Sequence, residues 1–129
     1  MTTSRRVGFW TGLRYRGKQG MLTWMLHRIT GLGIVLFVGM HVTVSFFGQQ
    51  FGSDWAFAVN AVYESWMFQI FVYFSVLFHA FNGSRVALMD LFPPLIRYQR
   101  ELIWLQWLIF LPLFLLPSLV MIQNALSGA

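Results

Sequence analysis

The chain has 129 residues, of which 57% are hydrophobic and 10% are charged, and it contains no cysteine. A soluble domain carries about a quarter charged residues, so the composition excludes an ordinary soluble protein and indicates a membrane protein. Without cysteine the chain has no disulfide and no thiolate ligand for an iron–sulfur cluster. The formal net charge is +5, but the basic residues flank apolar segments and form no basic face with stacking aromatics, so we expect no nucleic-acid partner.

The N-terminal residues 1–22 are predicted to form a basic arm on the cytoplasmic side. They contain five of the nine basic residues, together with several glycines. A secretory signal peptide needs a short apolar core followed by a cleavage site, and this pattern is absent here. We therefore interpret these residues as an ordered or semi-ordered arm.

Three apolar segments follow, at about residues 23–47, 66–91 and 102–126. Each is longer than the roughly 20 residues that cross about 30 Å of hydrocarbon as a helix. We therefore predict an all-α membrane protein, with a three-helix transmembrane anchor over residues 23–126 and a short tail at 127–129. Three helices bury too little to hold inward-facing polar residues alone, so we expect half of a heteromeric helical bundle.

The loop between the first two segments, residues 48–65, has helical spacing of its apolar residues after Asp54. We predict a short helix lying on the outer surface, with Asp54 as its N-cap. On the first segment, Gly31, Gly33 and Gly39 suit close approach of a second helix or of a cofactor.

Basic residues indicate the orientation of the three predicted spans. Those outside the arm are Arg28, Arg85, Arg97 and Arg100, and the loop 48–65 has none. With three crossings all the basic residues fall on one side. The positive-inside rule then predicts a cytoplasmic N-terminus and an outer C-terminus. We expect the plasma membrane of a prokaryote, rather than the mitochondrial inner membrane.

Two histidines, His41 and His79, lie deep inside apolar segments. Ionisable residues inside a membrane mark functional sites by default, and imidazole is a common axial ligand of haem iron. Gly83 and Asp90 lie on the same helix face as His79, and the glycine would let a flat porphyrin approach the backbone. The alternative is that each imidazole only hydrogen-bonds a neighbouring helix. His27 adjoins Arg28, and it can also be interpreted as a residue at the membrane interface.

The depth of the two buried histidines differs. His41 lies ~20 Å beyond Arg28 along the first helix, whereas His79 lies only ~9 Å from Arg85 along the second. If both arginines sit at similar depth, His41 lies ~10 Å farther toward the outside. The two rings would then not share one iron, each would need a partner histidine from another subunit, and up to two haems would stack across the membrane.

Two short motifs carry a family resemblance. Residues 27–31, HRITG, resemble the first-helix signature of the cytochrome b membrane-anchor subunit of succinate dehydrogenase. Residues 79–85, HAFNGSR, followed by Asp90, resemble the second signature of that family. The order and helix positions match over about residues 14–126, which is nearly the whole chain.

The resemblance implies roles for individual residues. His79 corresponds to an axial ligand of haem b, Arg28 to a residue at the quinone pocket, and His27 to a residue near a haem propionate. Gly83 and Arg85, which belong to the second motif, are expected at the cofactor as well.

The chain also departs from the one-haem members of that family. The serine expected at the quinone site is replaced by Trp24, with Thr23 one helical step away. Trp24 either stacks against the quinone ring or anchors the helix at the interface. His41 resembles the first-helix ligand of the two-haem members, where it serves the haem distal to the soluble subunits.

The function implied by the resemblance is that of a haem b-binding anchor subunit of succinate:quinone oxidoreductase. The implied partners are a second membrane-anchor subunit, an iron–sulfur subunit docked on the basic face and a flavoprotein subunit that oxidises succinate. Membrane quinone is the implied electron acceptor. The alternatives are a haem-free structural anchor, the anchor of a quinol:fumarate reductase, and an unrelated transport or assembly subunit with pore-lining histidines. Against the transport alternative, the sequence lacks the paired inverted repeats that many transporters show.

Overall fold

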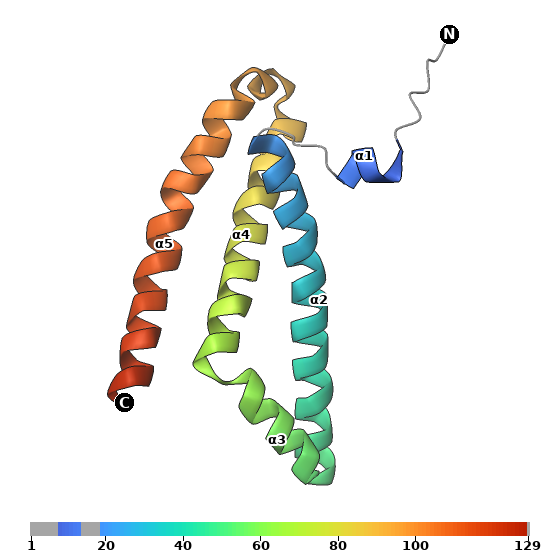
Figure 1. Cartoon of the computed structure of the whole chain (residues 1–129), viewed down its shortest axis with the longest axis vertical. Helices are drawn as coiled ribbons and strands as arrows, with labels where there is room; N and C mark the ends of the chain where they lie inside the picture. Colours follow the sequence, from blue (N-terminus) through green and yellow to red (C-terminus); the bar gives the residue numbers. More distant parts are fainter. Residues whose placement is uncertain (1–7, 14–18, 129) are drawn as a thin grey trace.

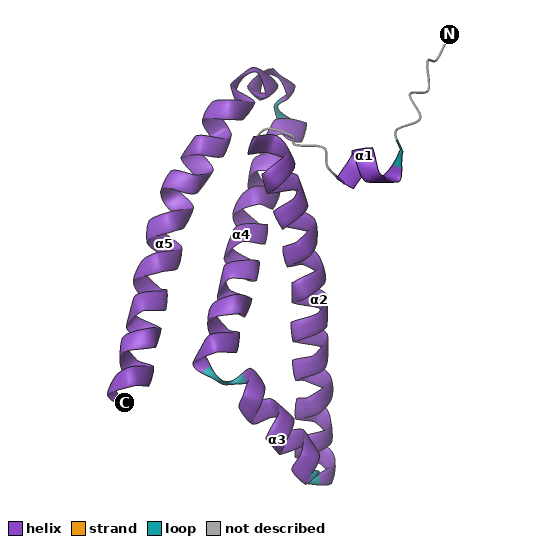
Figure 2. Ribbon diagram, in the orientation of Figure 1, coloured by secondary structure: helices purple, strands orange, loops and turns teal. Residues whose placement is uncertain are grey.

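The computed structural model describes residues 8–13 and 19–128, and every regular element in these ranges is a helix (Figure 2). The elements are α1 (Phe9–Leu13), α2 (Gln19–Phe51), α3 (Asp54–Tyr63), α4 (Trp66–Leu91), the 3₁₀ helix η1 (Pro93–Tyr98) and α5 (Gln99–Ser127). The all-α prediction is confirmed over the described part of the chain.

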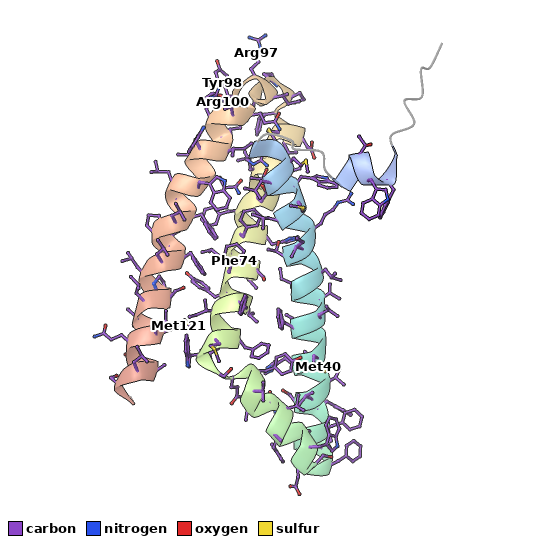
Figure 3. All side chains as sticks on the ribbon, viewed as in Figure 1. Met40, Phe74, Arg97, Tyr98, Arg100 and Met121 are labelled. Carbon is purple, nitrogen blue, oxygen red and sulfur yellow. The ribbon has the colours of Figure 1, made fainter. Side chains whose placement is uncertain are left out.

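The long helices α2, α4 and α5 run up and down beside one another (Figure 1). α4 is the central helix, because it packs against both α2 and α5, whereas α2 and α5 contact each other only slightly. The start of α2, the end of α4 and η1 lie at one end of the molecule, and α3 lies at the other (Figure 1). Arg97 and Arg100 lie together at the η1 end (Figure 3).

By length and composition, α2 and the η1–α5 segment can each cross a membrane, with mean hydropathies of 1.9 and 2.2. α3 and α4 qualify together as one span, but they are bent by 64° at residues 64–65. The chain is therefore a membrane protein, and its described residues contain two candidate spans, or three if the bent pair is counted. The orientation across the membrane stays a prediction.

The observed bounds refine the sequence interpretation. α4 has the predicted bounds, while α2 begins at Gln19 and so includes the last four residues of the predicted arm. Residues 1–7 and 14–18 of that arm lie outside the described residues. The short helix in the first loop is confirmed, but its N-cap is Ser53, whose side chain makes no capping hydrogen bond. Asp54 is instead the first helical residue, where its charge favours the helix dipole.

Aromatic rings fill the contact between α4 and α5. Phe78 and Phe110 are almost fully buried, and their ring centroids are 5.8 Å apart in an edge-to-face arrangement. Phe74 and Trp107 extend the same cluster on the two helices. Edge-to-face pairs are favourable beyond the area they bury, so this cluster fixes how α5 lies on the central helix.

α5 continues as one helix through Pro112 and Pro117. A proline has no N–H, so Pro117 leaves the carbonyl of Leu113 without its helical donor. The hydroxyl of Tyr73 on α4 donates to that carbonyl. This hydrogen bond satisfies a backbone group that lipid cannot satisfy.

Candidate functional site: a histidine pair between two helices

His27 on α2 and His79 on α4 form the centre of the candidate site. Their rings stack with centroids 4.0 Å apart and planes inclined by only 6°. α2 and α4 run in opposite directions (Figure 1), and each histidine is followed four residues later by a glycine, Gly31 and Gly83. The two helices thus present the same His-x-x-x-Gly pattern to each other.

The glycines make room for the rings. A Cβ atom at Gly31 would lie 3.0 Å from Cε1 of His79, and one at Gly83 would lie 3.6 Å from Cε1 of His27. Each ring therefore lies over the glycine of the opposite helix. The close approach expected at Gly31 is confirmed. At Gly83 the neighbouring group is the His27 ring. Gly33 makes ordinary contact with Ser75, and Gly39 faces open space in this chain, so the close approach expected there stays a prediction.

Hydrogen bonding fixes the tautomer of His79. Its Nδ1 lies 3.1 Å from the backbone carbonyl oxygen of His27 and 3.4 Å from Oγ1 of Thr30. The Thr30 hydroxyl itself donates to the same His27 carbonyl, at 3.0 Å. A carbonyl oxygen only accepts, so Nδ1 of His79 carries a proton, and in the neutral ring Nε2 keeps its lone pair. A backbone acceptor on one ring nitrogen is the usual support for a histidine that binds a metal through the other.

His27 is less well satisfied. Its Nδ1 is buried and has no hydrogen-bond partner. Buried polar atoms are nearly always paired, so this nitrogen is a candidate point of contact for a bound group. The sequence did not predict that His27 and His79 would be in contact.

Arg28 and Trp24 lie together on the exposed side of α2. The guanidinium carbon of Arg28 is 4.2 Å from the centroid of the Trp24 ring, which is a cation–π contact. Thr23 does not join them, because it is fully buried and its hydroxyl donates to the carbonyl of Gly20 at 3.0 Å. Of the three predicted quinone contacts, the structure therefore brings together two.

Arg85 is buried and links α4 to α5. Its Nε donates to Oε1 of Gln106 and its Nη2 to Oδ1 of Asn82, both at 2.9 Å. Asp90 is exposed and does not pair with Arg85. The sequence argument missed Gln106, although a polar side chain within the apolar stretch LIWLQWLIF was a signal.

His41 is far from the histidine pair. It lines a cavity of about 480 Å³ between α2, α3 and α4, together with Phe37, Tyr63, Glu64 and Tyr73 among others. At about 1.5 Å per residue, His41 lies ~21 Å beyond His27 along α2. Because His27 touches His79, the offset between His41 and His79 is about twice the ~10 Å expected from sequence. The assumption that Arg28 and Arg85 share one depth was wrong.

The fold and the histidine pair define an all-α membrane protein that holds imidazoles inside its helical bundle. Residues 10–117 match the family of the succinate dehydrogenase/fumarate reductase transmembrane subunit. Over 111 residues the chain is 36% identical to the succinate dehydrogenase 2 membrane subunit SdhC of Mycobacterium tuberculosis, covering 84% of this chain and 80% of that protein. The chain belongs to this family of transmembrane subunits.

The contact between Gly31 and His79 predicts a specific cost. In Gly31→Ala the new methyl group would lie 3.0 Å from Cε1 of His79, so the His79 ring must shift. That ring is already packed on His27 and has little room to move. Overpacking typically costs ~1–3 kcal/mol. We expect Gly31→Ala to lower the free energy of unfolding in detergent relative to Gly33→Ala, whose methyl group makes only ordinary contact. Equal stability of the two variants would contradict the packing described here.

Proposed function

We propose that the chain is a haem b-binding membrane-anchor subunit of succinate:quinone oxidoreductase in the plasma membrane of a prokaryote. It would dock an iron–sulfur subunit and a flavoprotein, and form the quinone site with a second anchor subunit. Succinate oxidation would take place on the flavoprotein, so this chain contributes electron transfer and quinone reduction. The single observation that carries the proposal is the fixed tautomer of His79, which leaves Nε2 with a free lone pair inside the bundle.

The residues around the pair fit a haem. Nε2 of His79 would supply a nitrogen ligand to the iron, and Nδ1 of His27 is a buried polar atom without a partner. When bound, a haem supplies a one-electron carrier within the membrane. The chain's own contribution is to hold the His79 ring between Gly31 and His27, and to keep its proton on Nδ1.

A second haem is proposed at His41. The ring lines a cavity whose other walls are largely aromatic and aliphatic, including Phe37, Val72 and Val76. His41 itself is exposed on an apolar helix of this chain, which is unfavourable against lipid. Both features favour a cofactor shared with the second anchor subunit at that level.

The quinone site is proposed beside Arg28 and Trp24. The guanidinium of Arg28 is positively charged and can donate a hydrogen bond to a quinone oxygen. Its charge stabilises the negative charge that develops on that oxygen during reduction. The indole of Trp24 is half exposed beneath the guanidinium and offers a flat stacking surface. Arg97 and Arg100, at the η1 end of the molecule, would belong to the basic face that meets the iron–sulfur subunit (Figure 3).

Substitution of His79 tests the proposal directly. We expect His79→Ala to abolish a b-type band in the reduced-minus-oxidised spectrum of the purified complex, because the axial nitrogen is lost. Gln123→Ala, at an exposed position near the end of α5, is a remote control and should leave the band unchanged. A fully assembled, quinone-active wild-type complex without any b-type signal would leave only the haem-free anchor.

The two-haem assignment has its own measurement. Haem content per complex should be two in wild type and one in His41→Ala, with the band that depends on His79 retained. A content of one that does not respond to His41→Ala rules out ligation by His41.

Arg28 is tested by separating quinone reduction from succinate oxidation. We expect Arg28→Leu to lower succinate:quinone activity about tenfold or more, as for a lost hydrogen bond to a charged group. Succinate-dependent reduction of a soluble dye, which bypasses the membrane, should be unchanged. Arg28→Lys keeps the charge but not the planar fork and should fall between the two. A parallel fall of both activities would indicate failed docking instead.

A further inference from the structure

We infer that Arg85 is a fixed intramembrane charge that raises the reduction potential of the haem proposed at His79, without touching it. The inference rests on the proposed function. It assigns to Arg85 an electrostatic role in place of the direct cofactor contact that the motif implies.

The guanidinium is held rigidly and out of reach of outside groups. Arg85 is 8% exposed, and its two hydrogen bonds reach Asn82, which is 2% exposed, and Gln106, which is 5% exposed. Its third nitrogen, Nη1, is also buried and has no partner. A group approaching from outside the chain therefore meets the enclosing side chains of α4 and α5 first.

The charge has no counter-ion among the described residues. The chain has four acidic residues, and all of them are exposed: Asp54, Glu64, Asp90 and Glu101. Arg85 makes no ion pair, and its two acceptors are neutral amide oxygens. A buried, unpaired cation is costly inside a membrane, which makes Arg85 a candidate for a functional role besides its link between α4 and α5.

The position of this charge suits an effect on the histidine pair. Arg85 lies six residues after His79, which is ~9 Å along the axis of α4. Salt screens an interaction between buried groups in a low-dielectric interior only weakly. Reduction of the iron adds one negative charge, so a nearby fixed positive charge favours the reduced state and raises the potential.

The experiment measures the midpoint potential of the b-type haem in the purified complex, together with its spectrum and haem content. Arg85→Gln removes the charge, and Gln106→Glu keeps the arginine and its acceptor oxygen while adding a carboxylate beside it. Both should shift the potential to lower values with an unchanged low-spin spectrum. Arg85→Lys should stay near wild type. Gln123→Glu makes the same change of side chain at the far end of α5 and should have no effect.

The outcomes separate this inference from the proposed function. An unmoved potential in Gln106→Glu, with haem retained, overturns the inference. Loss of haem in both Gln106→Glu and Arg85→Gln also overturns the inference. That result would show that the hydrogen bonds of Arg85 have a purely structural role. A wild-type complex that carries no b-type haem instead removes the proposed function itself.

Discussion

The reciprocal packing of two histidines over two glycines is the contact on which the site depends. His27 and His79 stack face to face, and each ring occupies the space left by a missing side chain on the facing helix. α2 and α4 can therefore approach closely only where both glycines are aligned with both rings. The same contact brings the His27 carbonyl to Nδ1 of His79, so helix packing and the protonation of a ring nitrogen are set together.

α4 organises the molecule because its faces carry different chemistry. The face toward α2 holds the imidazole pair, and the face toward α5 holds the aromatic cluster around Phe78 and the enclosed guanidinium of Arg85. Polar groups on both faces are satisfied largely by partners within the chain. The buried polar atoms without a partner at these two contacts are Nδ1 of His27, Nη1 of Arg85 and Nε2 of Gln106.

Much of the fold could be predicted from sequence because membrane helices are long and apolar. The bounds of α4 and the helix after Gly52 follow from hydropathy and spacing. The extension of α2 back to Gln19 could not be predicted, since a mixed polar and glycine-containing stretch carries no strong helical signal. The bend between α3 and α4 depends on tertiary packing, for example the ring of Phe57 lying 3.3 Å from a Cβ position at Gly48.

The candidate site was predicted in its residues more than in its geometry. The sequence singled out His27, His79 and Gly31 separately, but it did not predict that the His79 ring would stack on His27 and lie over Gly31. The depths of His41 and His79 were counted from Arg28 and Arg85, on the assumption that both arginines lie at a similar depth. In the structure Arg85 is buried and links α4 to α5. Counting residues gives position along a helix, but only packing gives the relative depth of two helices.

The bond from Tyr73 to the Leu113 carbonyl has a consequence for assembly. Pro117 creates one backbone acceptor on α5 that hydrocarbon cannot solvate, and a single phenol on α4 covers it. Sliding α5 by one turn would strand that oxygen in lipid. Although a proline usually disrupts a helix, Pro117 here favours one axial register of α5 relative to α4.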